Sequence, residues 1–168
     1  LYDSSLHSEW QSRVKDERAS VYIAQAGWKV SGSGAVIELL YPFENLEKKQ
    51  TANLDNTSVI ARLSFGNVSF LFTGDAFKAV EMELVETGAN ISSDVLQVGH
   101  HGSKTSSAER FIEEVSPEVA VISCGRNNRH GHPHQETLDS LAKYGINVLR
   151  TDAGGDIKIA SSGQDLKF

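Results

Sequence analysis

Cysteine and long apolar runs are what this chain of 168 residues most clearly lacks. Its single cysteine, Cys124, cannot form a disulfide within the chain, so cysteine usage does not identify a compartment. The apolar residues 119–122 before it favour a buried bystander over a nucleophile. No run approaches the ~18 apolar residues that a membrane-spanning helix needs, and no basic-then-apolar signal segment opens the chain. We therefore expect a soluble chain without a membrane segment of its own.

An initiator methionine, repeats and linkers are missing as well. The chain begins at Leu1 and contains only Met82, so we expect either a processed start or a piece of a larger protein. Residues 1–168 hold no repeat, low-complexity tract or interdomain linker, and they fit one domain. A domain of this length buries about two-thirds of the surface of its unfolded chain, so no disulfide or metal is needed merely to hold a core.

The charge balance lacks the basic excess that sequence-independent DNA binding favours. Lys and Arg number 16 against 22 Asp and Glu, a net charge of −6, and 39% of the residues are apolar, as in an ordinary soluble globular protein. Residues 100–135 are neutral, so the rest of the chain carries all the negative charge. The balancing groups are Lys104, Arg110, Arg126 and Arg129 against Glu109, Glu113, Glu114 and Glu118. Bound metal ions would make this region positive, so the acidity does not exclude a nucleic acid substrate.

The first half of the sequence predicts mainly strands. Leu6, Trp10 and Val14 recur at four-residue spacing and predict a short helix, although residues 1–35 are otherwise poorly readable. Apolar, β-rich runs predict strands at 21–24, 35–41, 59–65 and 68–72. The last two flank Gly66-Asn67, a two-residue turn typical of a hairpin. Residues 43–56 are polar and predict a loop.

The second half alternates helices and strands. Amphipathic patterns with start and stop signals predict helices within 77–88, 106–117 and 133–145, the second beginning with a Ser106/Glu109 capping box. Short apolar runs predict strands at 95–98, 119–123, 146–149 and 157–160. Together the elements predict an α/β fold with a mixed sheet and helices packed on one of its faces.

Polar groups follow two of the predicted strands. Asp75 comes after Thr73-Gly74 at the carboxyl end of a buried strand, where α/β sheets gather functional groups, although a helix N-cap is the alternative interpretation. His100 and His101 follow the next strand, between two glycines. Imidazole and carboxylate together suit zinc, manganese or iron. The sequence therefore predicts metal or phosphate contact at these strand ends.

A third polar tract follows the strand predicted at 119–123. It holds Arg126, Asn127, Asn128, Arg129, His130, His132 and His134. Backbone N–H groups at a helix start and arginine side chains both bind anions well. The alternative is a solvated polar loop with His132 as N-cap. Because three successive strand ends carry such groups, we favour a functional tract.

These tracts, in this order, resemble the metallo-β-lactamase-fold domain of the ComEC family of DNA-internalisation competence proteins. The match consists of Thr73-Gly74-Asp75, residues 98–106, Asn127-Asn128 and Gly131-His132-Pro133-His134, with further matches at 55–59 and 150–152. It covers residues 36–160. The resemblance implies a four-layer αββα sandwich, of which residues 1–168, as a single incomplete domain, supply mainly the second, C-terminal half.

The resemblance also implies a divalent-metal nuclease that acts on single-stranded DNA during natural-transformation DNA uptake. Asp75 would bridge two metals and His100 would ligate one, with manganese or zinc as the ions. Such a site generates hydroxide near neutral pH and stabilises an in-line displacement, which suits phosphodiester cleavage. Implied substrate contacts are His101, Ser103, Asn56, Ser58, Arg126 and Arg129. Implied catalytic residues are His132, His134 and Lys104, with His132 or His134 as the positioning group or proton donor.

One part of the family pattern is absent. A His-x-His-x-Asp-His motif should precede the matched region, yet the only histidine before His100 is His7, whose neighbours do not fit. We therefore expect metal binding by this chain alone to be weak or absent, and the chain alone to be inactive. The missing first half of the domain, or a second copy, would cover the exposed sheet face. The parent would be a bacterial integral membrane protein with a channel part, and this domain would lie on its extracytoplasmic side.

Two hypotheses from different classes stay open. The first is the catalytic half of a metal-dependent phosphodiesterase, and the second is a non-catalytic binding or scaffold module that kept the anion-binding loops without the metals. A small-molecule hydrolase of the same fold is a further rival to the nuclease.

Overall fold

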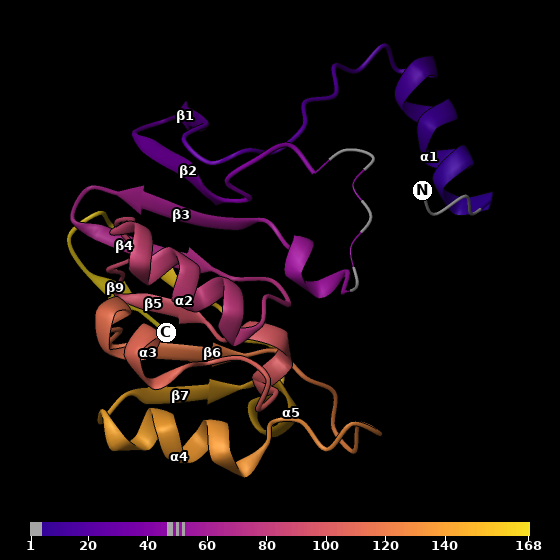
Figure 1. Ribbon diagram of the computed structural model, residues 1–168. Coiled ribbons are helices and arrows are strands. Elements are labelled where there is room, and N and C mark those ends of the chain that lie inside the picture. Colours follow the sequence, from indigo (N-terminus) through magenta and orange to yellow (C-terminus); the bar gives the residue numbers. More distant parts are fainter. Residues whose placement is uncertain (1–4, 47–48, 50, 52) are drawn as a thin grey trace.

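A mixed seven-stranded sheet dominates the structure (Figure 1). The computed structural model describes residues 5–46, 49, 51 and 53–168. The strands lie side by side in chain order, antiparallel from β1 to β4 and parallel from β4 to β7. They are β1 (Lys29–Gly32), β2 (Ala35–Tyr41), β3 (Ile60–Phe65), β4 (Val68–Phe72), β5 (Val95–Gln97), β6 (Val119–Ile122) and β7 (Asn147–Arg150). The predicted mixed α/β sheet is confirmed.

Three helices cover one face of this sheet. They are α2 (Lys78–Thr87), α3 (Glu109–Val115) and α4 (Gln135–Lys143). Leu84 of α2 and Phe111 of α3 are buried against Leu71 of β4, while Leu141 of α4 is buried against Ile122 of β6. Full burial of one such side chain stabilises the fold by about 1.5–3 kcal/mol. The prediction that the helices pack on one sheet face is therefore confirmed.

Turn residues set the register of the antiparallel half. Gly66 and Asn67 connect β3 to β4, and Phe65 pairs with Val68, so the predicted hairpin is confirmed. Ser33 and Gly34 turn the chain from β1 to β2 with φ angles of 51° and 82°, as a type I′ turn requires. The strand predicted at 21–24 is wrong, because this turn pairs residues 29–32 with β2 instead.

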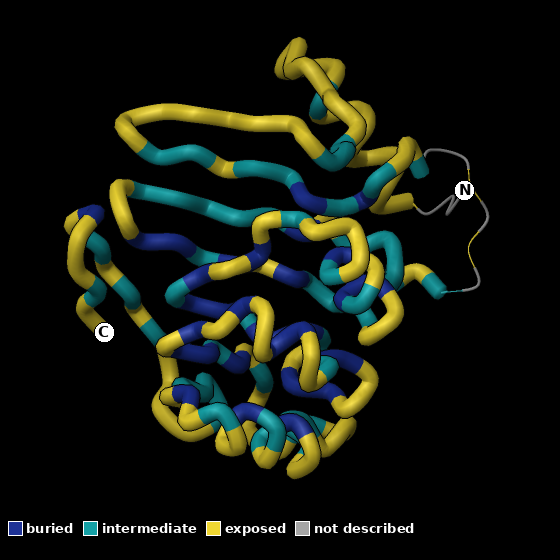
Figure 2. Tube along the Cα trace, turned by 60° about the vertical axis from the view of Figure 1, so that its left-hand side comes forward, coloured by how far each residue is buried: buried dark blue, intermediate teal, exposed yellow. Residues whose placement is uncertain are grey.

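The face opposite the helices is apolar and only partly covered. Cross-strand pairing places Val30, Ile37, Leu63 and Phe70 in one row on that face. Val30 is 64% exposed and Ile37 is 40% exposed. In Figure 2, β1 is exposed and β2 is mostly of intermediate burial, so this part of the sheet is only partly covered.

The C-terminal segment crosses part of this face. Ile157 and Ile159 line a cavity of about 230 Å³ together with Phe70, Phe72 and Val121. The strand predicted at 157–160 is wrong, because only β8 (Ala160–Ser161) pairs, and its partner is β9 (Leu166–Lys167) rather than the large sheet. The large sheet therefore ends at β7, and β8 and β9 form a separate two-stranded sheet.

The N-terminal helix α1 (Ser5–Asp16) stands away from the sheet (Figure 1). Its existence was predicted from the four-residue spacing of Leu6, Trp10 and Val14, and the structure confirms it. Its side chains are exposed, apart from the half-buried Val14. Among the described residues no helix is both long and apolar enough to cross a membrane.

The parallel half of the sheet places four loops at one edge. The chain leaves β4 toward Asp75, β5 toward the 3-10 helix η2 (Gly99–Gly102), and β6 toward the loop before α4. After β7 it enters the short helix α5 (Thr151–Gly154). A further 3-10 helix, η1 (Asp55–Thr57), precedes β3. Because parallel strands end at the same edge, all of the polar tracts singled out in the sequence meet there.

Candidate metal and phosphate site

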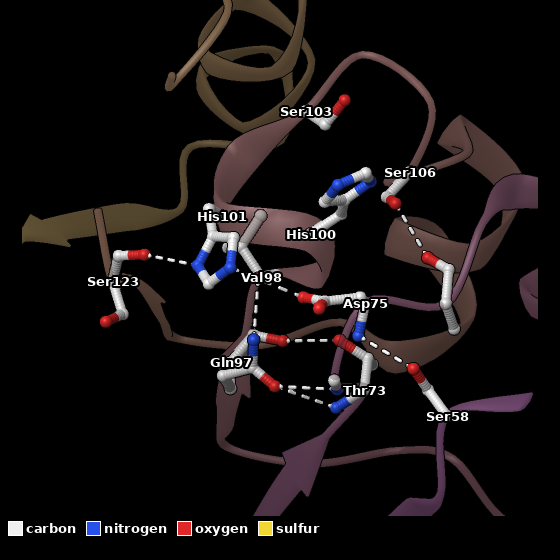
Figure 3. A network of polar contacts seen from close by, with 12 residues as sticks. Ser58, Thr73, Asp75, Gln97, Val98, His100, His101, Ser103, Ser106 and Ser123 are labelled. Atoms are coloured by element: carbon white, nitrogen blue, oxygen red, sulfur yellow. Dashed lines mark hydrogen bonds and ion pairs between the residues drawn. The ribbon is translucent and has the colours of Figure 1, made fainter. Parts of the chain in front are cut away.

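The Asp75 loop is held by a side chain from the neighbouring strand. Gln97 accepts hydrogen bonds at Oε1 from the backbone N–H groups of Thr73 and Gly74, both at 3.0 Å. Thr73 in turn donates its hydroxyl to the carbonyl of Gln97 at 2.9 Å. Figure 3 shows this clamp directly below Asp75. The loop is therefore rigid where it presents its carboxylate.

Two residues predicted to bind substrate, Ser58 and Asn56, also support the Asp75 loop. The Asp75 N–H donates to Ser58 Oγ at 3.1 Å, and the Phe77 N–H donates to Asn56 Oδ1 at 3.3 Å. Gly74 has a φ of +57°, and a Cβ there would lie 3.1 Å from the Ser58 Cβ, so glycine permits this close approach. Ser58 and Asn56 thus position Asp75, and substrate contact by either stays a prediction.

His100 and His101 both adopt left-handed backbone conformations, with φ angles of 48° and 56°. Such conformations cost of order 1–3 kcal/mol each in non-glycine residues and persist where the surroundings enforce them. The carbonyl of Gly74 accepts the N–H of His100 at 3.0 Å, which ties this turn to the Asp75 loop. Strain held in place by such contacts is typical of a functional site.

The two imidazoles are oriented by different partners. His100 Nδ1 lies 3.1 Å from Thr105 Oγ1, and its ring stacks on Phe77 with centroids 5.3 Å apart, so that Nε2 is the nitrogen not engaged by Thr105. His101 Nδ1 lies 2.7 Å from the carbonyl oxygen of Ser123 and must donate, because a carbonyl oxygen only accepts. His101 Nε2 then faces Asp75 Oδ1 at 3.5 Å (Figure 3).

His132 is the centre of a cluster that contains five of the six histidines of the chain. Its ring centroid lies 4.9 Å from that of His134 and 5.6 Å from those of His100 and His130. Burial, followed by repulsion from the surrounding histidines, lowers the pKa of His132. The surroundings of His132 therefore favour its neutral form.

The loop that carries these histidines is built around Asn128. Its Oδ1 accepts the N–H of His132 at 2.9 Å, and its Nδ2 donates to the carbonyls of Gly125 and His132. His134 is fixed to the other loop, since its N–H donates to the carbonyl of Gly102 and its Nδ1 accepts the N–H of Lys104 at 3.1 Å. With Nδ1 accepting, neutral His134 carries its proton on Nε2.

The remaining predicted residues have distinct environments. Ser103 is buried, with its Oγ 2.9 Å from Thr105 Oγ1, whereas Lys104 is exposed. Arg126 Nε donates to the carbonyl of Asp152 and Arg129 Nε donates to His130 Nε2, both at 3.1 Å. Both arginines are exposed, and Arg129 lies beside the histidine cluster.

Cys124 is half-buried and lines a cavity of about 320 Å³ together with His101, Asn128, His130 and His132. Burial, reinforced by Asp152, raises the pKa of the Cys124 thiol. A raised pKa disfavours the thiolate and so favours a bystander over a nucleophile, although Cys124 is half-buried and not buried as predicted.

Sequence reasoning missed the side chains that assemble this site. Gln97 is a polar residue in an otherwise apolar strand, and Glu81 is a charged residue on the buried face of α2. A polar residue within an apolar pattern was the sequence signal that could have identified them. The predicted Ser106/Glu109 capping box is wrong, because Ser106 donates its hydroxyl to the carbonyl of Ala76 at 2.6 Å. Glu81 of α2 accepts hydrogen bonds from the N–H groups of Ser107 and Ala108, the two residues just before α3.

Asp75 and His100 are donors of the types that zinc and manganese bind. Within the part of the chain that the structure describes, however, no group of three or more His, Cys, Asp or Glu side chains is arranged to hold a metal ion. The residues present therefore fit only part of a ligand set.

Comparison with known proteins shows the superfamily and the fold. The model of the metallo-beta-lactamase superfamily matches residues 5–126, so the chain belongs to that superfamily. The fold also resembles the crystal structure of a protein described as a metal-dependent hydrolase from Parabacteroides distasonis. That match has a TM-score of 0.53 and 17% identity, and it covers 83% of this chain and 61% of the other.

Within the superfamily, the relatives of this chain include ComEC-family competence proteins. The chain is 45% identical over 112 residues to ComE operon protein 3 of Bacillus subtilis and 40% identical over 119 residues to competence protein ComA of Neisseria gonorrhoeae. These matches cover 67% and 69% of this chain. The chain spans 14% and 17% of the length of these two relatives.

Proposed function

We propose that this chain is the second half of a metal-dependent phosphodiesterase domain that cleaves DNA, most readily single-stranded DNA, during DNA uptake. The observation that carries the proposal is the convergence of Asp75 with five histidines at one sheet edge, on loops that also carry Arg126 and Arg129. The names of the relatives, which refer to competence, support the assignment of DNA as substrate.

Asp75 and His100 are the residues that would hold a divalent metal, manganese or zinc. A bound metal pair supplies a nucleophile at neutral pH and stabilises an in-line displacement. His100 would use its Nε2 for this role, since Thr105 engages Nδ1. The other ligands would come from outside the residues that the structure describes, because these supply only part of a ligand set.

His134 would donate a proton or a hydrogen bond to the scissile phosphate. The N–H of Lys104 occupies its Nδ1, so the proton sits on Nε2. His132 would bind beside it as a neutral group, in keeping with its lowered pKa. His101, Ser103, Lys104, Arg126 and Arg129 would contact the nucleic acid, with the arginines neutralising backbone phosphates.

The apolar sheet face opposite the helices would receive the first half of the domain. Val30, Ile37 and Phe72 are partly exposed there, and this chain covers only 61% of the P. distasonis structure that it resembles. A second copy of the chain is the alternative occupant. We place the domain on the extracytoplasmic side of a bacterial membrane protein, next to its channel part.

One observation favours a second function. Since the described residues hold no three-ligand group, the chain could serve as a non-catalytic module that binds DNA through the same histidines and arginines. A small-molecule hydrolase is the remaining rival within the enzyme class.

The test is cleavage of labelled single-stranded DNA by a longer form of the protein that includes the first half of the domain. With Mn²⁺ we expect cleavage, and Asp75→Ala should abolish it, while the exposed Asp16→Ala on α1 should leave it unchanged. Metal content is measured in parallel by elemental analysis. A longer form that takes up metal and leaves DNA intact would refute the nuclease, and retained cleavage by Asp75→Ala would refute a metal-bridging role for that residue.

A further inference from the structure

Glu81 is a fully buried carboxylate whose partners lie on another element. It is 0% exposed on α2, among the apolar side chains that pack α2 against α3. Its Oε1 accepts the N–H of Ser107 and its Oε2 accepts the N–H of Ala108, both at 2.7 Å. These two amides belong to the residues just before α3, which begins at Glu109, so Glu81 ties the chain that leads into α3 to α2.

Three further contacts bind the same two segments to each other. Ser106 Oγ donates to the carbonyl of Ala76 at 2.6 Å, and the N–H of Lys78 donates to the carbonyl of Thr105 at 2.9 Å. The N–H of His100 donates to the carbonyl of Gly74 at 3.0 Å. Hydrogen bonds therefore join residues 74–81 to residues 100–108 at several points along both segments. The bonds to Glu81 lie at the C-terminal end of each segment.

A carboxylate is the side chain that this position requires. Two backbone N–H groups point into a buried site, and each would cost about 1–3 kcal/mol if it lost its acceptor. A carboxylate presents two acceptor oxygens, whereas an amide presents one oxygen and turns its NH₂ group toward the second donor. Ser107 has a φ of 62°, so the segment also depends on these bonds to hold an uncommon backbone conformation.

We propose that Glu81 is a positioning residue, which holds the loop of residues 100–108 in the place from which His100 faces the Asp75 loop. We call the hydrogen bonds from Ser107 and Ala108 to Glu81 the Glu81 clamp. Its consequence for catalysis rests on the proposed function, but the Glu81 clamp itself does not. Glu81 touches neither metal nor substrate and would act through the His100 loop alone.

The clamp is tested in the metal-free 168-residue chain at pH 8, where Glu81 is mostly ionised. Amide hydrogen exchange is measured for wild type, Glu81→Gln and the control Glu86→Gln, an exposed residue of the same helix. We expect Ser107 and Ala108 to exchange at least tenfold faster in Glu81→Gln and unchanged in Glu86→Gln. The ring resonances of His100 should shift in Glu81→Gln while those of His7 on α1 stay in place, which a loss of stability alone would not produce.

Two results would overturn the proposal. One is unchanged exchange at Ser107 and Ala108, or unmoved His100 resonances, in a folded Glu81→Gln variant. The other needs no variant: exchange of these two amides in the wild type as fast as that of exposed loop amides would show that no clamp exists. If the clamp holds but the longer protein leaves DNA intact, the proposed nuclease fails and the clamp stands.

Discussion

The burial of Glu81 predicts that the free energy of unfolding falls as the pH rises from 4.5 to 7. Desolvation raises the pKa of this carboxyl from 4.5 to about 7, against the opposing effect of its two backbone hydrogen bonds and of Lys78. In this pH range the folded state holds a proton that the unfolded state has released. The stabilisation is therefore complete below pH 4.5 and is lost as the pH rises through the folded-state pKa.

The magnitude follows from the size of the shift. Each unit of pKa difference corresponds to about 1.4 kcal/mol, so a rise from 4.5 to about 7 amounts to about 3 kcal/mol in total. For a domain of this size that is a large part of the total stability, which is typically about 5–15 kcal/mol.

Urea unfolding of wild type, Glu81→Gln and Glu86→Gln at several pH values between 4.5 and 8 measures the effect. Relative to Glu81→Gln, which cannot titrate at this position, the wild type should lose about 3 kcal/mol across that range, at about 1.4 kcal/mol per pH unit in its steepest part. The Glu86→Gln variant should follow the wild type. A constant difference between wild type and Glu81→Gln at all pH values would refute the reasoning.

Three further predictions concern the loops around the site. Gly102→Ala would place a Cβ 2.6 Å from the Pro133 Cβ at a φ of +81°, and it should destabilise the fold by about 1–3 kcal/mol more than Gly131→Ala, whose φ is also positive but whose Cβ would meet open space. If urea unfolding showed that both variants lose the same free energy of unfolding, the close approach of Gly102 to Pro133 would be contradicted. Gln97→Leu should lower the free energy of unfolding by about 1–3 kcal/mol for each of the two N–H groups that lose their acceptor. The control Gln11→Leu, at an exposed position, should lower it little. A Gln97→Leu variant as stable as wild type would show that the Gln97 hydrogen bonds do not stabilise the fold. Arg150→Gln should bring the pKa of Asp152 from about 2 back toward 3.8, because the hydrogen-bonded guanidinium is the main cause of the depression. An NMR titration of Asp152 that shows no rise would exclude Arg150 as that cause.

The parts of the fold that the sequence predicted are those with local signals. Gly66-Asn67 between two apolar runs defines a hairpin within about a dozen residues, and the structure has it. The run at 21–24 has strand-like composition but no partner, whereas Lys29–Gly32 pairs because of the turn at Ser33-Gly34. Strand composition without a pairing signal was insufficient here.

In the site, too, the residues with a local sequence signal were predicted and those without one were missed. Asp75, His100 and His101 were predicted from their place after strands, and the structure brings them to one edge. The roles of Gln97 and Glu81 depend on contacts between residues 23–27 positions apart. At α3 the local Ser106/Glu109 pattern was misleading, because Ser106 bonds to Ala76 and the two amides just before the helix donate to Glu81 of α2.

Strand β1 has one side paired with β2 and lies at the end of the strand order. Its other side presents backbone N–H and C=O groups to any extended chain that approaches, so this chain in isolation carries a template for strand addition. Lys29, which pairs with Glu38 at 3.2 Å and stays exposed, is the kind of charged edge residue that opposes such growth. The solubility of the purified chain at high concentration should therefore depend on Lys29, a residue far in sequence from every group proposed for chemistry.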